Sequence, residues 1–306
     1  MHLDFQTAND LIAEKLQSNQ PFSCLRIDNT AGYVIDCVLK QTRPLESIYN
    51  PSSLIEGGIY PNDVDFAINA IMSKTFNIMK KADILGFVDI SNEIRNGPLS
   101  RQFDKPMFFN PDFYVMDPGA LLGHAEKQFG IKKPTLPWTY FLKGKKVLVI
   151  STHADSIKHQ WKRNDKIWGE NKDLIVPYDL VDVIRSPYHP AMDSRQPPNC
   201  SNWFDSVEYI KRLIDTYDYD VLLAGCTTSA PFYVDHAKSM GKVGIQTGGV
   251  IQLHFGIYGY RWTKVPGHSE WHKMFNKHWM YPLQSDEADQ RSNHPNLETN
   301  FAYWRT

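Results

Sequence analysis

The chain has little cysteine, no long apolar run and almost no net charge. Its 306 residues include only four cysteines and no CxxC pair, which favours reduced thiols over a disulfide framework. No apolar run approaches the ~20 residues of a membrane span, and the first residues do not resemble a signal peptide. A formal net charge of −1 without a basic cluster argues against a nucleic-acid partner. We therefore expect a soluble, cytoplasmic protein.

Several signatures of common chemistry are also missing. The chain has no GxGxxG fingerprint, no P-loop and no GxSxG elbow, which argues against a dinucleotide site, a P-loop nucleotidase and an α/β-hydrolase. His268, His272 and His278 are loosely spaced and lack partner ligands, so a zinc site is not expected.

Apolar runs of strand length alternate with helical patterns, most regularly in the second half. The expected strands are 22–27, 84–88, 145–151, 180–185, 220–224 and 243–246, and the expected helices are 8–17, 33–39, 62–81, 156–168, 203–217, 231–240 and 250–255. This alternation predicts an α/β fold with a Rossmann-like, wound parallel sheet. We expect one domain over 1–306, with possible halves 1–143 and 144–257 and an irregular tail, 258–306.

Two small turns follow neighbouring strands in the sequence. The first, Gly225 to Ser229, contains the adjacent hydroxyls of Thr227, Thr228 and Ser229 before a helix, and the second contains Gly248-Gly249. Open α/β sheets bind ligands beyond the carboxyl ends of their strands, where unpaired N–H groups and helix N-termini attract phosphate. The alternative interpretations are simple helix capping for the hydroxyls and a tight turn with nothing bound for the glycines.

Other strand ends offer charged side chains. Arg26, Asp28 and Asn29 follow one strand, where Asp28 could hold Mg²⁺ or Mn²⁺ on a diphosphate, or could merely cap a helix. His153 follows another strand and could orient a phosphate or carry a proton. Arg185 could bind phosphate or form a structural ion pair.

A general base is harder to assign. Glu56 lies in a glycine-rich segment, Glu56-Gly57-Gly58, and is the preferred candidate; Asp89 and Glu93, beyond another strand, compete with it. The alternative for each is a solvated loop carboxylate.

The segment from Gly241 to Trp262 resembles a pattern of bacterial polysaccharide-biosynthesis glycosyltransferases with the GT-D fold. The matching residues are Gly241, Lys242, Gly248, Gly249, Gln252, Leu253, Phe255, Gly256, Ile257, Gly259, Arg261 and Trp262. Two shorter segments, 82–87 and 142–150, resemble further parts of the same family.

The resemblance implies a GT-D-like transferase that moves a hexosyl or related sugar from a nucleotide sugar to a glycan hydroxyl. We expect Arg26, Asn29, Arg185, the residues of both turns and Gln252 to hold the donor. The family's early Asp-x-Glu pair is altered, because Asn29 and Ala31 stand in its places and Asp28 lies one residue early. A non-catalytic nucleotide-sugar or glycan binder therefore stays open, as does a phosphate-ester hydrolase using His153.

Overall fold

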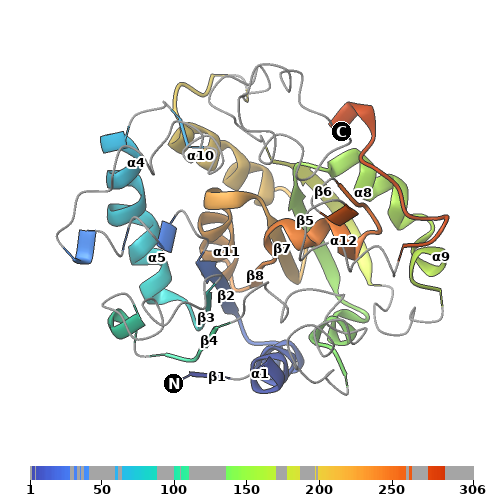
Figure 1. The fold of residues 1–306 in the computed structure, drawn as a ribbon, viewed down its shortest axis with the longest axis horizontal. Coiled ribbons are helices and arrows are strands. Elements are labelled where there is room, and N and C mark those ends of the chain that lie inside the picture. The colour runs from blue at the N-terminus through green and yellow to red at the C-terminus, as the bar shows by residue number, and fades with distance from the viewer. Residues whose placement is uncertain are drawn as a thin grey trace.

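The fold is built around one twisted parallel sheet, which appears at the centre of the computed structural model (Figure 1). The structure describes residues 2–3, 5–27, 31–32, 35, 38–40, 59–60, 64–87, 100–103, 105–109, 136–169, 178–186, 197, 199–259, 262–263 and 275–286. The expected Rossmann-like α/β class is confirmed.

The sheet has eight strands in the order β1-β4-β3-β2-β8-β7-β5-β6, and every recorded pairing is parallel. The strands are β1 (His2–Leu3), β2 (Phe22–Ile27), β3 (Ile84–Phe87), β4 (Met107–Phe109), β5 (Lys146–Ser151), β6 (Asp179–Arg185), β7 (Val221–Gly225) and β8 (Val243–Gln246). Because β8 pairs with both β2 and β7, strands from the two halves of the chain form one sheet.

Alternate residues of each strand enter different cores. On β7, Leu222 and Ala224 belong to one buried cluster, whereas Val221 and Leu223 belong to the other. The near-continuous apolar strands are thus explained, because both faces of a parallel sheet are covered by helices. In Figure 1, α4, α5, α10 and α11 gather on one side of the strands, and α8, α9 and α12 lie on the other.

Most helices lie where the sequence predicts them, but several are shorter than predicted. They are α1 (Phe5–Ser18), α4 (Val64–Ala70), α5 (Phe76–Lys81), α8 (Ala154–Trp161), α9 (Asn164–Trp168), α10 (Trp203–Ile214), α11 (Ala230–Ser239) and α12 (Ile251–His254), with 3₁₀ turns η2 (Ser100–Gln102), η5 (Trp138–Leu142), η7 (Thr227–Ser229), η8 (Gly248–Val250) and η10 (Gln284–Asp286).

Two long helices predicted from the sequence are interrupted. The expected helix 62–81 contains a π-helical turn, η1 (Ile71–Thr75), closed by a bond from the Phe76 N–H to the Ile71 carbonyl. The expected helix 156–168 is divided into α8 and α9 at Arg163, whose backbone leaves the helical region (φ −138°, ψ 29°) and whose side chain donates to Gln160. A periodicity argument detects neither break, because both segments keep their apolar faces.

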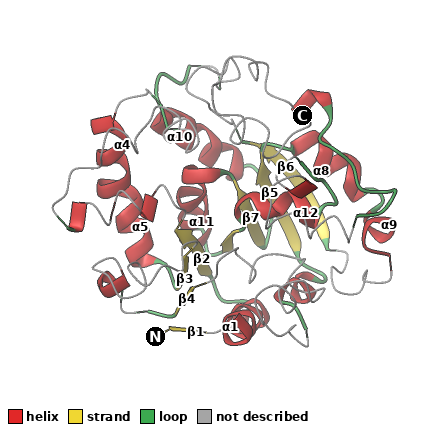
Figure 2. Cartoon of the chain, in the orientation of Figure 1, coloured by secondary structure: helices red, strands yellow, loops and turns green. Residues whose placement is uncertain are grey.

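Residues 275–286 run as an irregular segment beside α8 and α9 (Figure 2). The Met280 N–H donates to the Gly256 carbonyl, and the Gln160 amide donates to the carbonyls of Gly256 and His278. The segment ends at η10, where the side chain of Asp286 is completely buried. No helix within the described ranges is long and apolar enough to cross a bilayer.

Candidate functional site

The candidate site lies at the carboxyl edge of the sheet, where β2, β8 and β7 end side by side. Arg26 lies near the end of β2, the Gly248-Gly249 turn follows β8, and Gly225 is the last residue of β7. Arg26, Gly225 and Gly249 are each half-buried. The parallel sheet therefore brings together three elements that are far apart in the sequence.

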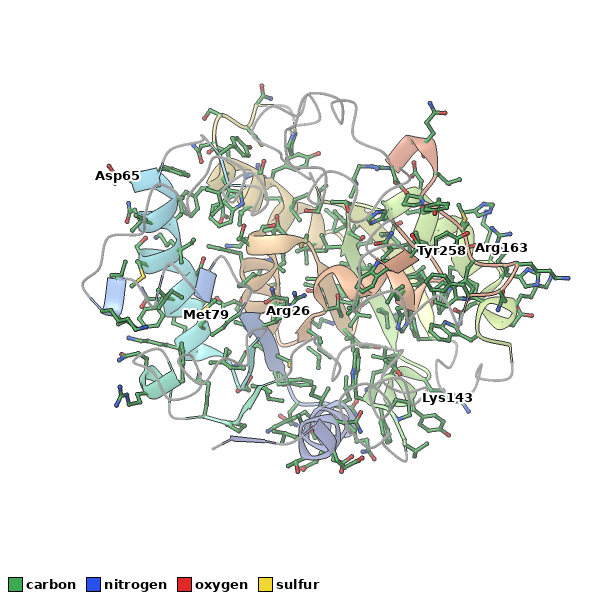
Figure 3. The ribbon with its side chains drawn as sticks, in the orientation of Figure 1. Arg26, Asp65, Met79, Lys143, Arg163 and Tyr258 are labelled. Carbon is green, nitrogen blue, oxygen red and sulfur yellow. The ribbon has the colours of Figure 1, made fainter. Side chains whose placement is uncertain are left out.

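Arg26 lies directly against Gly248. A Cβ atom built on Gly248 would overlap Nη1 of the Arg26 guanidinium, and the φ of +63° at Gly248 also disfavours any other residue. The backbone N–H of Arg26 donates to the side-chain oxygen of Gln246, 3.0 Å away, which fixes β2 against β8 at this point. Figure 3 shows Arg26 near the centre of the molecule. A guanidinium is thus held over a backbone turn, an arrangement suited to an anion.

The turn after β8 also approaches Gly225 closely. A Cβ on Gly225 would meet the Gly248 carbonyl oxygen at 2.8 Å and would overlap the side chain of Ile251. The Thr247 N–H, in turn, donates to the Ala224 carbonyl. Gly225 is therefore required by packing within the protein, and this packing brings the β7 and β8 turns into contact.

Thr247 carries an unusual hydroxyl. The residue is 2 % exposed, and its Oγ1 atom has no hydrogen-bond partner among the described residues. A buried hydroxyl without a partner is costly, by about 1–3 kcal/mol, and such groups are uncommon. Thr247 lies between Gln246, whose side chain bonds to β2, and Gly248, which contacts Arg26.

The hydroxyls after β7 turn inward. Ser229 donates its hydroxyl to the Cys226 carbonyl at 2.9 Å and makes no side-chain cap on α11, and Thr228 is only 2 % exposed. Burial raises the pKa of the Cys226 thiol to about 12, although Ser229 and Ser186 oppose the shift. Cys226 is consequently a protonated core residue, and the hydroxyls of Thr228 and Ser229 are buried. The Thr227 side chain is outside the described residues.

Arg185 and His153 lie at the ends of β6 and β5. The guanidinium pairs with Asp155 through Nη2 and with Asp286 through Nη1, each at 2.8 Å. His153 is 4 % exposed, and its Nδ1 lies 3.1 Å from the Thr152 hydroxyl. In this structure Arg185 makes the ion pairs of the structural alternative, and His153 is buried among its neighbours.

Asp286 occupies the anion position at the N-terminus of α8. Its carboxylate accepts hydrogen bonds from the N–H groups of Asp155 and Ser156 and from the Ser156 hydroxyl. Helix N-termini favour negative charge, and the C-terminal segment supplies that charge here. The end of β5 is thus filled by the protein itself, which leaves the neighbouring ends of β2, β8 and β7 as the candidate site.

The other expected site residues divide into two groups. Gln252 is completely buried on α12, and its side-chain oxygen lies 3.4 Å from Nε1 of Trp262. Asp28, Asn29 and Glu56 lie outside the described residues. Within the described ranges, no group of three or more His, Cys, Asp or Glu side chains could hold a metal ion.

Sequence reasoning missed Gln246, Thr247 and Asp286. Thr247 could have been noticed, because it follows a predicted strand and precedes the glycine pair. Asp286 carries no local signal, since it lies in a polar tail far along the chain from α8.

Comparison of this chain with known proteins finds a distant structural similarity and no similar sequence. No protein-family model matches the chain, and no curated protein matches it. Among solved structures, a selenomethionine-substituted domain of unknown function 1792 aligns with 86 % of this chain and 86 % of its own, at 14 % identity and a TM-score of 0.37.

Proposed function

We propose that this protein binds a nucleotide sugar at the carboxyl edge of β2, β8 and β7 and transfers the sugar to a hydroxyl of a glycan. The observation that carries the proposal is the Arg26 guanidinium lying against Gly248. The resemblance of 241–262 to GT-D glycosyltransferases supports the choice of ligand.

The chemistry requires stabilisation of a departing nucleoside diphosphate. Negative charge grows on the diphosphate as the sugar leaves, and fixed cations and N–H dipoles lower the energy of that state. Arg26 would supply the cation, and the backbone of the Gly248-Gly249 turn would supply N–H groups. The Thr247 hydroxyl would find its missing partner in a phosphate or ribose oxygen.

The remaining roles belong to residues for which the structure gives no geometry. Asp28 would hold Mn²⁺ or Mg²⁺ together with substrate phosphates, and Glu56 would take the proton of the acceptor hydroxyl.

A second candidate is a nucleotide-sugar or glycan binder without turnover. Asn29 and Ala31 stand where the resembling enzymes carry their acidic pair, and this favours loss of catalysis. Both candidates use the same Arg26 site, so binding alone does not separate them.

The test is incubation with a panel of nucleotide sugars, with and without Mn²⁺ or Mg²⁺, followed by measurement of nucleoside diphosphate release and of binding by calorimetry. Transfer predicts release that is lost in Arg26→Ala and retained in Arg101→Ala, a change of an exposed arginine on η2. Binding without release supports the binder.

Two outcomes would overturn the site itself. One is nucleotide affinity that is unchanged in Arg26→Ala. The other is release of inorganic phosphate from simple esters without any acceptor, which would point to hydrolysis at His153.

A further inference from the structure

A groove of about 530 Å³ lies on the helical layer formed by α5, α10 and α11, away from the strand ends. Its described lining is Ser73, Lys74, Asn77, Ile78, Lys81, Phe204, Glu208, Lys211 and Phe232. We propose that this groove binds an acidic, amphipathic helical segment of a partner protein.

The walls of the groove are two helical stripes. Lys74, Ile78 and Lys81 are spaced i, i+4 and i+7 along η1 and α5, and Phe204, Glu208 and Lys211 have the same spacing on α10. Residues at this spacing share one face of a helix over two turns, or about 10 Å. α11 contacts both α5 and α10 and contributes Phe232 between the stripes. Two helical stripes with apolar surface between them are the kind of surface on which an amphipathic helix docks.

Apolar and positive groups lie side by side within the groove. Phe204 and Ile78 are half-buried and present ring and aliphatic surface, with Phe232 beneath. Phe204 and Phe232 lie with ring centroids 6.3 Å apart, and the Lys211 ammonium lies 5.8 Å from the Phe232 ring. A ligand must accordingly place apolar side chains against the rings.

The charges of the groove indicate which charge the partner segment carries. Lys211 is paired with Glu208 at 2.8 Å. Lys74 and Lys81 are exposed, and neither has an ion-pair partner within the described ranges. They lie two helical turns apart, so one small anion would not neutralise both. Two carboxylates seven residues apart on a helix would match them.

The π-helical turn strengthens the assignment. η1 contributes Ser73 and Lys74 to the groove, and π-helical turns are rare and occur frequently at functional sites. The turn is also where the helix departs from the regular pattern that its sequence predicts.

The probe is a fluorescent 14-residue amphipathic helical peptide with a leucine stripe and two glutamates seven residues apart, measured by anisotropy on the full chain. We expect binding that weakens at least about tenfold in the Lys74→Glu, Lys81→Glu double variant, because two attractions become repulsions. The matched control is Lys143→Glu, Lys166→Glu, two exposed lysines elsewhere, which should bind as the unaltered chain does.

A charge swap makes the test specific. A peptide with lysine in place of both glutamates should bind the Lys74→Glu, Lys81→Glu variant more tightly than it binds the unaltered chain. Equal binding of a glutamine peptide, or an equal loss in the control variant, would overturn the proposal. Displacement of the peptide by a simple dicarboxylate at similar affinity would assign the groove to a small anion instead.

Discussion

The Arg185 guanidinium meets the carboxylate of Asp286 at 2.8 Å, Nη1 to Oδ1, and Asp286 is completely buried. The same guanidinium meets Asp155, whose side chain is 45 % exposed, at 2.8 Å through Nη2. One arginine thus holds two carboxylates that differ in burial and in hydrogen bonding, because only Asp286 also accepts bonds from the first N–H groups of α8.

Asp286→Ala should lower the free energy of unfolding by about 3 kcal/mol, because it removes one partner of a buried ion pair and leaves the first N–H groups of α8 without their acceptor. Asp155→Ala should cost less than about 1 kcal/mol, since water screens an exposed pair. Urea denaturation of the two variants measures both values. Equal losses would show that the burial of Asp286 has no energetic consequence.

Gly248→Ala should weaken nucleotide binding about tenfold or more, because the new Cβ displaces the Arg26 guanidinium. Gly241→Ala is its control: φ is +77° there, but no atom lies within 4 Å of the added Cβ. Both variants should lose about 1 kcal/mol of stability through the left-handed backbone. Calorimetric titration with a nucleoside diphosphate measures the affinity of each variant. Equal affinities would show that Gly248 does not contribute to the nucleotide site.

His254 should make stability dependent on pH. Burial lowers its pKa from 6.5 to about 3, and its ring lies 3.1 Å from the Tyr178 hydroxyl. Between these two values the unfolded chain binds a proton that the folded chain does not, so stability is retained above pH 6.5 and falls by about 1.4 kcal/mol per pH unit below it.

His254→Gln should flatten this slope, and His159→Gln, at an exposed position of α8, should leave it unchanged. Denaturant unfolding at several pH values below 6.5 gives both slopes. A His254→Gln slope that matches the unaltered chain would show that the imidazole becomes protonated within the fold.

Local pattern predicted β2, β3 and β5 to β8, since a parallel strand covered on both faces is a short apolar run, but it missed the two-residue β1. Val243–Gln246 and Phe22–Ile27 match their predicted bounds. The convergence of Arg26 and the glycine turns followed from one rule, that parallel strands end at the same edge.

The order of the strands in the sheet could not be predicted in the same way. Nothing in the residues of β8 specifies β2 as a neighbour, because its position depends on the crossover through α11 and on helices that cover the other face. The partner of Arg185 was equally inaccessible, since an ion pair between distant segments leaves no periodic trace. The π-helical turn and the break at Arg163 were missed because they preserve the apolar faces that periodicity measures.

The position of β8 constrains when the sheet can form during synthesis of the chain. β8 lies between β2 and β7 but is the last of the described strands in the sequence, so the two flanks of the sheet cannot be joined until its residues have left the ribosome. Until then β2 and β7 each present an unpaired strand edge, the kind of surface on which nascent chains aggregate. Pairing of β8 with both strands therefore covers these two edges and removes this route to aggregation of the nascent chain.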